Sequence, residues 1–184
     1  RRDCSLCRGL GEVYEGQRWE EPDRFVLPKG HTAPGLYAAR ANRGYFPVED
    51  LLTLRHIGSH LQGHPNMNLT PGIDMSTGSL GQGLSCAAGM AKASKILGDG
   101  ATIYAIVGDG ECQEGQIWEA AMTAAQYKLD NLITFVDVNK AQCDGWVDDI
   151  VSMHHMKERW EAFGFFAQEI DGHDVKAIYD AIQN

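Results

Sequence analysis

The chain of 184 residues carries 25 acidic and 16 basic side chains, a formal charge of −9, and 43% of its residues are hydrophobic. This composition supports one domain with its own core and argues against nucleic acid as a partner, which needs a positively charged surface. The sequence contains no run of about 20 apolar residues, which is the length needed to span a bilayer. The amino end also lacks the apolar segment of a signal peptide. We therefore expect a soluble, cytoplasmic protein with no membrane partner.

The cysteines do not suggest a disulfide scaffold. The chain contains five of them, Cys4, Cys7, Cys86, Cys112 and Cys143. An odd number in a chain with ample apolar content favours reduced thiols. Cys4 and Cys7 have the spacing of half a zinc site, but no second pair of ligands follows them.

The amino-terminal half predicts helices separated by a loop. Helical patterns cover residues 34–42 and 48–57, and a segment rich in Gly, Pro and Asn predicts a loop over residues 63–72. Residues 78–97 favour one long helix whose first half is crowded with Gly, Ala and Ser. Small side chains allow close approach of the backbone, which fits either tight helix packing or contact with a ligand.

From residue 100 onward, short apolar β-rich runs alternate with helical patterns. Strands are predicted over residues 101–107, 132–138 and 165–170, and helices over residues 114–127, 157–163 and 174–182. Asp174 is well placed to cap the last helix. This alternation predicts an α/β fold with a doubly wound, mostly parallel sheet and helices on both faces.

One turn at the end of a predicted strand has chemical potential. Gly108-Asp109-Gly110 follows residues 101–107 and precedes a helix, and parallel sheets bind ligands at this edge. Asn139 leaves the next strand at the same edge, so we expect its oxygen and that of Asp109 to reach one cation. Carboxylate, amide and phosphate oxygens are the ligands that Mg²⁺ prefers. A plain strand-to-helix turn is the alternative.

Short motifs follow one another along the chain in a fixed order. They are DRFVL and KGH (23–27, 29–31), GHP (63–65), STGSLGQG (76–83), GDGE and QEG (108–111, 113–115), YKLDNL (127–132), and WEAFG with DGHD (160–164, 171–174). In this order they resemble the transketolase family over most of the chain. The resemblance implies a thiamine diphosphate-binding fold, of the diphosphate-binding domain, and ketol transfer between sugar phosphates of the pentose phosphate pathway.

The same resemblance implies a cofactor and metal site. Asp109, Asn139 and the carbonyl of Ala141 would bind Mg²⁺ or Ca²⁺, and the Gly110 N–H would face the diphosphate of the cofactor. The rings of thiamine diphosphate would lie against the backbone of Gly78, Ser79 and Leu80, with the side chains of Leu80 and Cys143 as apolar walls.

Catalytic residues are also implied. His31 and His64 match histidines that face the cofactor and the substrate, where imidazole can move protons near neutral pH. Glu114 and Glu119 match acidic residues that contact the neighbouring subunit and link paired active sites; a solvated helix face is their alternative. His56, His60, His154 and His155 are assigned to the surface or to the core.

Complete enzymes of the family contain a second domain, whose glutamate contacts the aminopyrimidine ring, and no segment here resembles it. We therefore expect residues 1–184 to be a single domain that is incomplete at both ends. It would work with a carboxyl-terminal transketolase subunit in a homo- or hetero-oligomer such as a dimer. The alternatives are a related enzyme, such as a 1-deoxyxylulose-5-phosphate synthase or a transketolase for an unusual sugar, and a non-catalytic subunit that kept the fold.

Overall fold

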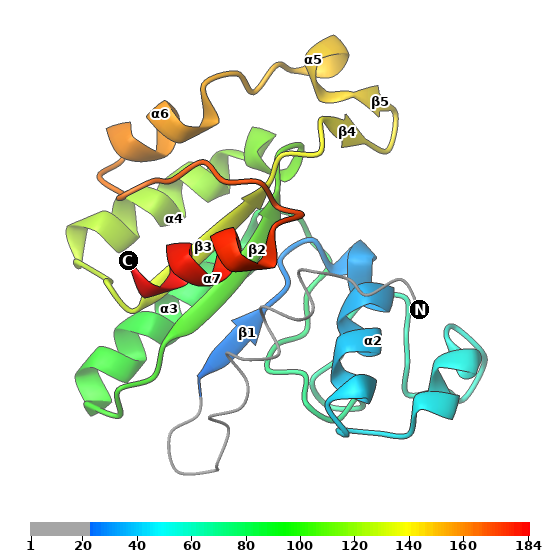
Figure 1. Ribbon diagram of the computed structural model, residues 1–184. Coiled ribbons are helices and arrows are strands. Elements are labelled where there is room, and N and C mark those ends of the chain that lie inside the picture. Colours follow the sequence, from blue (N-terminus) through cyan, green and yellow to red (C-terminus); the bar gives the residue numbers. More distant parts are fainter. Residues whose placement is uncertain (1–22) are drawn as a thin grey trace.

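The computed structural model describes residues 23–184, and a parallel three-stranded sheet lies at its centre (Figure 1). The strands are β1 (Arg24–Val26), β2 (Ile103–Gly108) and β3 (Leu132–Asp137), in the order β1-β2-β3. Five of the six β2 residues are buried, as expected for a central parallel strand covered on both faces. The register pairs Gly108 with Asp137, so β2 and β3 end side by side.

Helices cover both faces of the sheet, as the sequence predicted (Figure 1). Alternate β2 residues face opposite sides: Ile103, Ala105 and Val107 belong to one core, and Tyr104 and Ile106 to another. The first core receives α3 (Gln82–Leu97), α4 (Gly115–Gln126) and α6 (Met156–Ala162), and the second receives α2 (Ala33–Asn42) and α7 (Val175–Gln183). The alternation of strands and helices therefore yields the doubly wound α/β arrangement.

Shorter elements connect these layers. They are the 3-10 helices η2 (Gly30–Thr32), η3 (Val48–Thr53) and η4 (Glu111–Gln113), the helix α5 (Val147–Ile150), and the antiparallel pair β4 (Ala141–Gln142) and β5 (Gly145–Trp146). Asp174 caps α7 as predicted, since its carboxylate accepts hydrogen bonds from the N–H groups of Lys176 and Ala177.

Two predicted elements were wrong, and a third begins later in the sequence than predicted. Residues 165–170 form no strand, because among the described residues nothing pairs with them. The helix expected over residues 48–57 is the 3-10 helix η3, which ends where Arg55 takes a φ of 63°. The long helix starts at Gln82 rather than Gly78, because Gly81 has a φ of 85° that a helix cannot contain.

Cys86, Cys112 and Cys143 are free thiols, as expected, whereas Cys4 and Cys7 lie outside the described residues. Within residues 23–184, no helix is both long and apolar enough to cross a membrane.

Two glycines of α3 should respond oppositely to a methyl group. A Cβ on Gly83 would lie 2.7 Å from the Pro28 Cα, whereas a Cβ on Gly89 would meet nothing within 4 Å. We expect Gly83→Ala to lower the free energy of unfolding by about 1–3 kcal/mol through overpacking. Gly89→Ala should raise it by about 0.4–1 kcal/mol, because alanine restricts the unfolded chain. Urea unfolding measures both, and equal effects would contradict the close approach of α3 to Pro28 in the loop after β1.

Candidate functional site

Asp109 lies at the carboxyl end of β2 and is only 3% exposed. Its Oδ1 accepts a hydrogen bond of 2.8 Å from the N–H of Gly110, and its Oδ2 accepts one of 2.7 Å from the N–H of Lys140. The Asp109 N–H in turn donates to the carbonyl of Asp137 at 3.1 Å. The carboxylate is therefore fixed between its own turn and the segment that follows β3.

The segment after β3 carries two further oxygen atoms that could bind a cation, the amide oxygen of Asn139 and the carbonyl oxygen of Ala141. Asn139 is exposed, its Oδ1 accepts from the Ala141 N–H at 2.9 Å, and its Nδ2 donates to Asp137 at 3.2 Å. Ala141 begins β4. Carboxylate, amide and carbonyl oxygens are the donors that hard cations prefer. In the part of the chain that the structure describes, no three His, Cys, Asp or Glu side chains gather to hold a metal, so a cation here would need the amide and main-chain oxygens.

Two buried charged residues support this edge, and neither was among the predicted site residues. Lys29 is 8% exposed and donates to the carboxylate of Asp137. Glu111 is 3% exposed and accepts hydrogen bonds from the N–H groups of Gly81 at 2.9 Å and Gly108 at 3.2 Å. Burial raises the pKa of Glu111, while the two backbone N–H groups and Lys29 act in the opposite direction. Lys29 lies in the KGH motif and Glu111 in the GDGE motif. The sequence signal that could have identified them is a charged residue next to a buried strand.

Glu111 joins the Asp109 turn to the segment that precedes α3. Because α3 begins only at Gln82, the backbone of Gly78, Ser79 and Leu80 is not helical, and Leu80 is exposed. A Cβ on Gly78 would lie 3.1 Å from the Cδ2 of His64. The expected ring-binding segment is therefore next to one of the two expected histidines.

The structure also brings His31 into this neighbourhood. A Cβ on Gly30 would lie 2.8 Å from the carbonyl oxygen of Thr77, so the loop that carries His31 touches the loop that carries Gly78. Burial lowers the pKa of His31, and the positive charges of Lys29 and His64 lower it further. The imidazole of His31 is accordingly mostly neutral at pH 7, able to donate from one nitrogen and accept at the other.

Gly110 and Cys143 lie next to the sheet edge that carries Asp109 and Asn139. A Cβ on Gly110 would lie 3.1 Å from the Cβ of Gln142, so glycine allows the β4 segment to approach. The Gly110 N–H donates to Asp109, and a diphosphate would have to share or replace that bond. Cys143 is exposed in the turn between β4 and β5.

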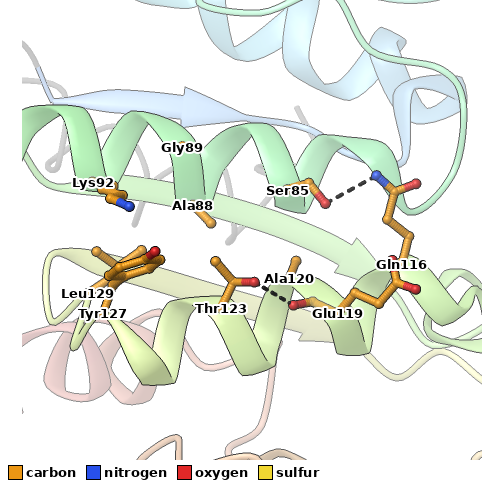
Figure 2. A pocket seen from close by; sticks show the side chains of 10 residues that line it. All are labelled: Ser85, Ala88, Gly89, Lys92, Gln116, Glu119, Ala120, Thr123, Tyr127 and Leu129. Atoms are coloured by element: carbon orange, nitrogen blue, oxygen red, sulfur yellow. Dashed lines mark hydrogen bonds between the residues drawn. The ribbon is translucent and has the colours of Figure 1, made fainter.

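Glu114 and Glu119 lie on the α4 side of the site. Glu114 is the N-cap residue of α4, and its Cβ would lie 3.0 Å from a Cβ on Gly81. Glu119 lines a groove of about 330 Å³ between α3 and α4, which Figure 2 shows with the hydrogen bond from Gln116 to Ser85. Glu119 thus faces the outside of two packed helices, and the structure does not join it to Asp109 and Asn139.

Among the other histidines, His60 contacts Asp50 at 3.1 Å, and His56, His154 and His155 are exposed. Their placement agrees with the surface or core assignment.

These features define an α/β domain in which the edge at the carboxyl ends of the strands carries oxygen ligands for a hard cation, with two histidines nearby. A family model described as "Transketolase, thiamine diphosphate binding domain" matches residues 12–184. The chain belongs to the transketolase family, and it is the thiamine diphosphate-binding domain of that family.

Curated relatives are similar over nearly the whole chain. The "6-deoxy-6-sulfo-D-fructose transketolase subunit SqwG" of Clostridium sp. (strain MSTE9) is 48% identical over 97% of this chain and 68% of its own length. An apulose-4-phosphate transketolase subunit of Actinobacillus succinogenes is 45% identical over 89% of this chain and 59% of its own length. Human transketolase is 44% identical over 91% of this chain and 27% of its own length.

Solved structures agree with the family. A transketolase mutant from Pichia stipitis matches with a TM-score of 0.90 and 31% sequence identity. The match covers 97% of this chain and 29% of the Pichia stipitis chain. The transketolase of Campylobacter jejuni has a TM-score of 0.85 at 32% identity, covering 97% of this chain and 30% of its own.

The buried Glu111 should make stability depend on pH. Folding raises its pKa above the ordinary value of 4.5, so the folded state binds the proton more tightly than the unfolded state. The contribution of this group to the free energy of unfolding therefore falls as pH rises from about 4.5 through the raised pKa. Glu111→Gln removes this titration.

We expect the stability of Glu111→Gln relative to the parent protein to increase with pH across that window, as measured by urea unfolding at several pH values. Parallel pH profiles for the two proteins would show that Glu111 does not titrate abnormally.

Proposed function

We propose that this chain is the amino-terminal part of a transketolase that binds thiamine diphosphate and Mg²⁺ (or Ca²⁺) and transfers a two-carbon ketol unit from a ketose phosphate to an aldose phosphate. A separate carboxyl-terminal subunit would complete the active site within a hetero-oligomer. The observation that carries the proposal is the contact of Asp109 with the Asn139 to Ala141 segment, at a sheet edge near the loops that carry His31 and His64.

The donor set fits the proposed metal. Asp109 provides a carboxylate, Asn139 an amide oxygen and Ala141 a carbonyl oxygen, and Mg²⁺ completes such a set with phosphate oxygens and water. The hydrogen bond from Lys140 to Asp109 orients the carboxylate before any ion arrives. Preorganised ligands of this kind lower the cost of binding.

The remaining residues would orient and protonate. When bound, the cofactor would supply a nucleophilic thiazolium carbon for ketol transfer. His31, which is mostly neutral at pH 7 because its pKa is lowered, can hydrogen-bond a sugar hydroxyl or accept its proton. His64 would share this role from the neighbouring loop. Glu114 and Glu119 would contact the neighbouring subunit, and Leu80 and Cys143 would border the cofactor rings.

A transketolase for an unusual sugar is a second candidate. Two relatives are named for substrates outside the common sugar phosphates, 6-deoxy-6-sulfo-D-fructose and apulose 4-phosphate, and both are called subunits. These names support a two-component enzyme and favour a substrate with an anionic end. Ketol transfer by the chain together with the carboxyl-terminal subunit, assayed with ordinary sugar phosphates, 6-deoxy-6-sulfo-D-fructose and apulose 4-phosphate, would identify the substrate.

Asp109→Ala should abolish cofactor binding that depends on Mg²⁺. We expect calorimetry on the chain mixed with its carboxyl-terminal subunit to show an affinity loss of more than about 100-fold, the upper effect of residues that only support a ligand. Asp109→Asn, which keeps the shape of the side chain, should lose most of the affinity while remaining folded by circular dichroism.

Asp180→Ala is the matched control, because Asp180 is exposed on α7 and pairs with Lys176. It should leave the affinity unchanged. Unchanged binding by both Asp109 variants would remove the metal assignment, and an assembled complex that binds the cofactor without any ketol transfer would favour the non-catalytic subunit.

A further inference from the structure

We infer that Gln113 is a positioning residue that clamps residues 140–151 to the turn of Asp109. This segment contains β4, β5 and α5, and it carries the Ala141 carbonyl and the Cys143 side chain. The clamp is the pair of hydrogen bonds that the side-chain amide of Gln113 donates to two separate parts of the segment. Its consequence for cation binding rests on the proposed function, whereas the clamp itself does not.

The segment has little core of its own. Among the described strands, β4 and β5 pair only with each other, over two residues each, and an isolated two-stranded hairpin is marginally stable. Figure 1 shows β4, β5 and α5 beyond the carboxyl end of β3. Across residues 141–151, all of which the structure describes, Val147 is the one buried side chain. The segment therefore needs further contacts to keep a fixed position.

The Gln113 amide contacts the segment near both of its ends. Its Nε2 donates a hydrogen bond of 2.6 Å to the Oε1 of Gln142 in β4. The same nitrogen donates a hydrogen bond of 2.9 Å to the carbonyl of Val151, directly after α5. A primary amide nitrogen has two hydrogens, one for each of these acceptors. One side chain thereby ties both β4 and the end of α5 to η4.

Gln113 is itself fixed to the Asp109 turn. It is the last residue of η4, and its N–H donates to the carbonyl of Gly110 at 3.2 Å. The N–H of the buried Cys112 donates to the carbonyl of Asp109 at 3.1 Å, and the Cys112 carbonyl accepts from the Nε1 of Trp118 at 2.9 Å. The backbone of Gln113 therefore keeps its place relative to the Asp109 carboxylate.

The clamp acts where the proposed cation ligands meet. Lys140 lies between the two expected ligands of the segment, and its φ of 64° is a left-handed conformation that surrounding contacts must maintain. Its N–H donates to Asp109, and its carbonyl accepts from the Val147 N–H at 2.9 Å. A cation on Asp109 would compete with Lys140 for the same carboxylate. The bonds of Gln113 use no atom of the proposed ligands, so they hold the segment whether or not the cation is bound.

The first test needs no cofactor. Hydrogen exchange of the backbone amides of Lys140 and Val147 is followed by NMR in the full chain at constant pH. Gln113→Leu keeps most of the side-chain volume but has no donor, and it should lower the protection of both amides about fivefold or more, as expected for two lost hydrogen bonds. Gln142→Leu removes one acceptor and should have a smaller effect. The double variant should exchange no faster than Gln113→Leu alone.

Gln168→Leu is the matched control, because Gln168 also donates from its side-chain amide to a backbone carbonyl, that of Ala181 at 3.2 Å. It should leave the protection of Lys140 and Val147 unchanged. Equal protection in the parent protein and Gln113→Leu would overturn the clamp. Additive effects of the Gln113 and Gln142 substitutions would overturn it as well, because the two side chains would then act separately.

The second test uses the complex with the carboxyl-terminal subunit and thiamine diphosphate. The affinity for Mn²⁺, measured by electron paramagnetic resonance, should fall about tenfold in Gln113→Leu, the lower end of the effects of groups that orient metal ligands. At saturating Mn²⁺ and cofactor, kcat should stay within about twofold of the parent value, because the clamp acts on cation binding rather than on the reacting atoms. A purely structural role would instead reduce the amount of active protein, and hence kcat, at unchanged affinity. Gln168→Leu should change neither quantity.

An unchanged Mn²⁺ affinity in Gln113→Leu would contradict the positioning role. If the parent complex binds neither the cation nor the cofactor, the proposed function fails and the positioning role fails with it. The exchange measurement on the chain alone then decides for or against the clamp.

Discussion

The site depends on a carboxylate that is buried where water cannot solvate it. Glu111 is 3% exposed. Burying an unpaired charge costs on the order of several kcal/mol, unless hydrogen bonds and a counter-charge offset that cost. Here the N–H groups of Gly81 and Gly108 and the nearby Lys29 provide part of this compensation, and burial still raises the pKa of Glu111. One side chain thereby fixes the start of α3 against the end of β2.

The consequence is a rigid carboxyl edge made from distant parts of the chain. Lys29 connects the loop after β1 to Asp137 at the end of β3, and Lys140 connects the segment after β3 to Asp109. Under the proposed function, the cation and diphosphate lie between these anchors, and His31 and His64 face the substrate.

Patterns of short range predicted most of the fold. The apolar runs of β2 and β3 and the helical periods of α4, α6 and α7 were legible because each element repeats its own period, and Asp109 and Asn139 were placed at one edge by strand order alone. The three residues of β1 are too few to carry a period. Gly81 takes its importance from its φ value, and Glu111 takes its importance from contacts with distant residues, which no local pattern contains. Residues 165–170 had the right composition for a strand but no described partner.

The central claim is that Asp109, Asn139 and Ala141 hold the cation that binds the cofactor diphosphate. The most direct measurement is a crystal structure of the chain with its carboxyl-terminal subunit, thiamine diphosphate and Mn²⁺, which accepts the same oxygen ligands as Mg²⁺. The account predicts an anomalous peak within about 2.0–2.3 Å of the Asp109 carboxylate, the Asn139 Oδ1 and the Ala141 carbonyl, together with diphosphate oxygens. A bound cofactor whose metal lies on other residues would contradict it.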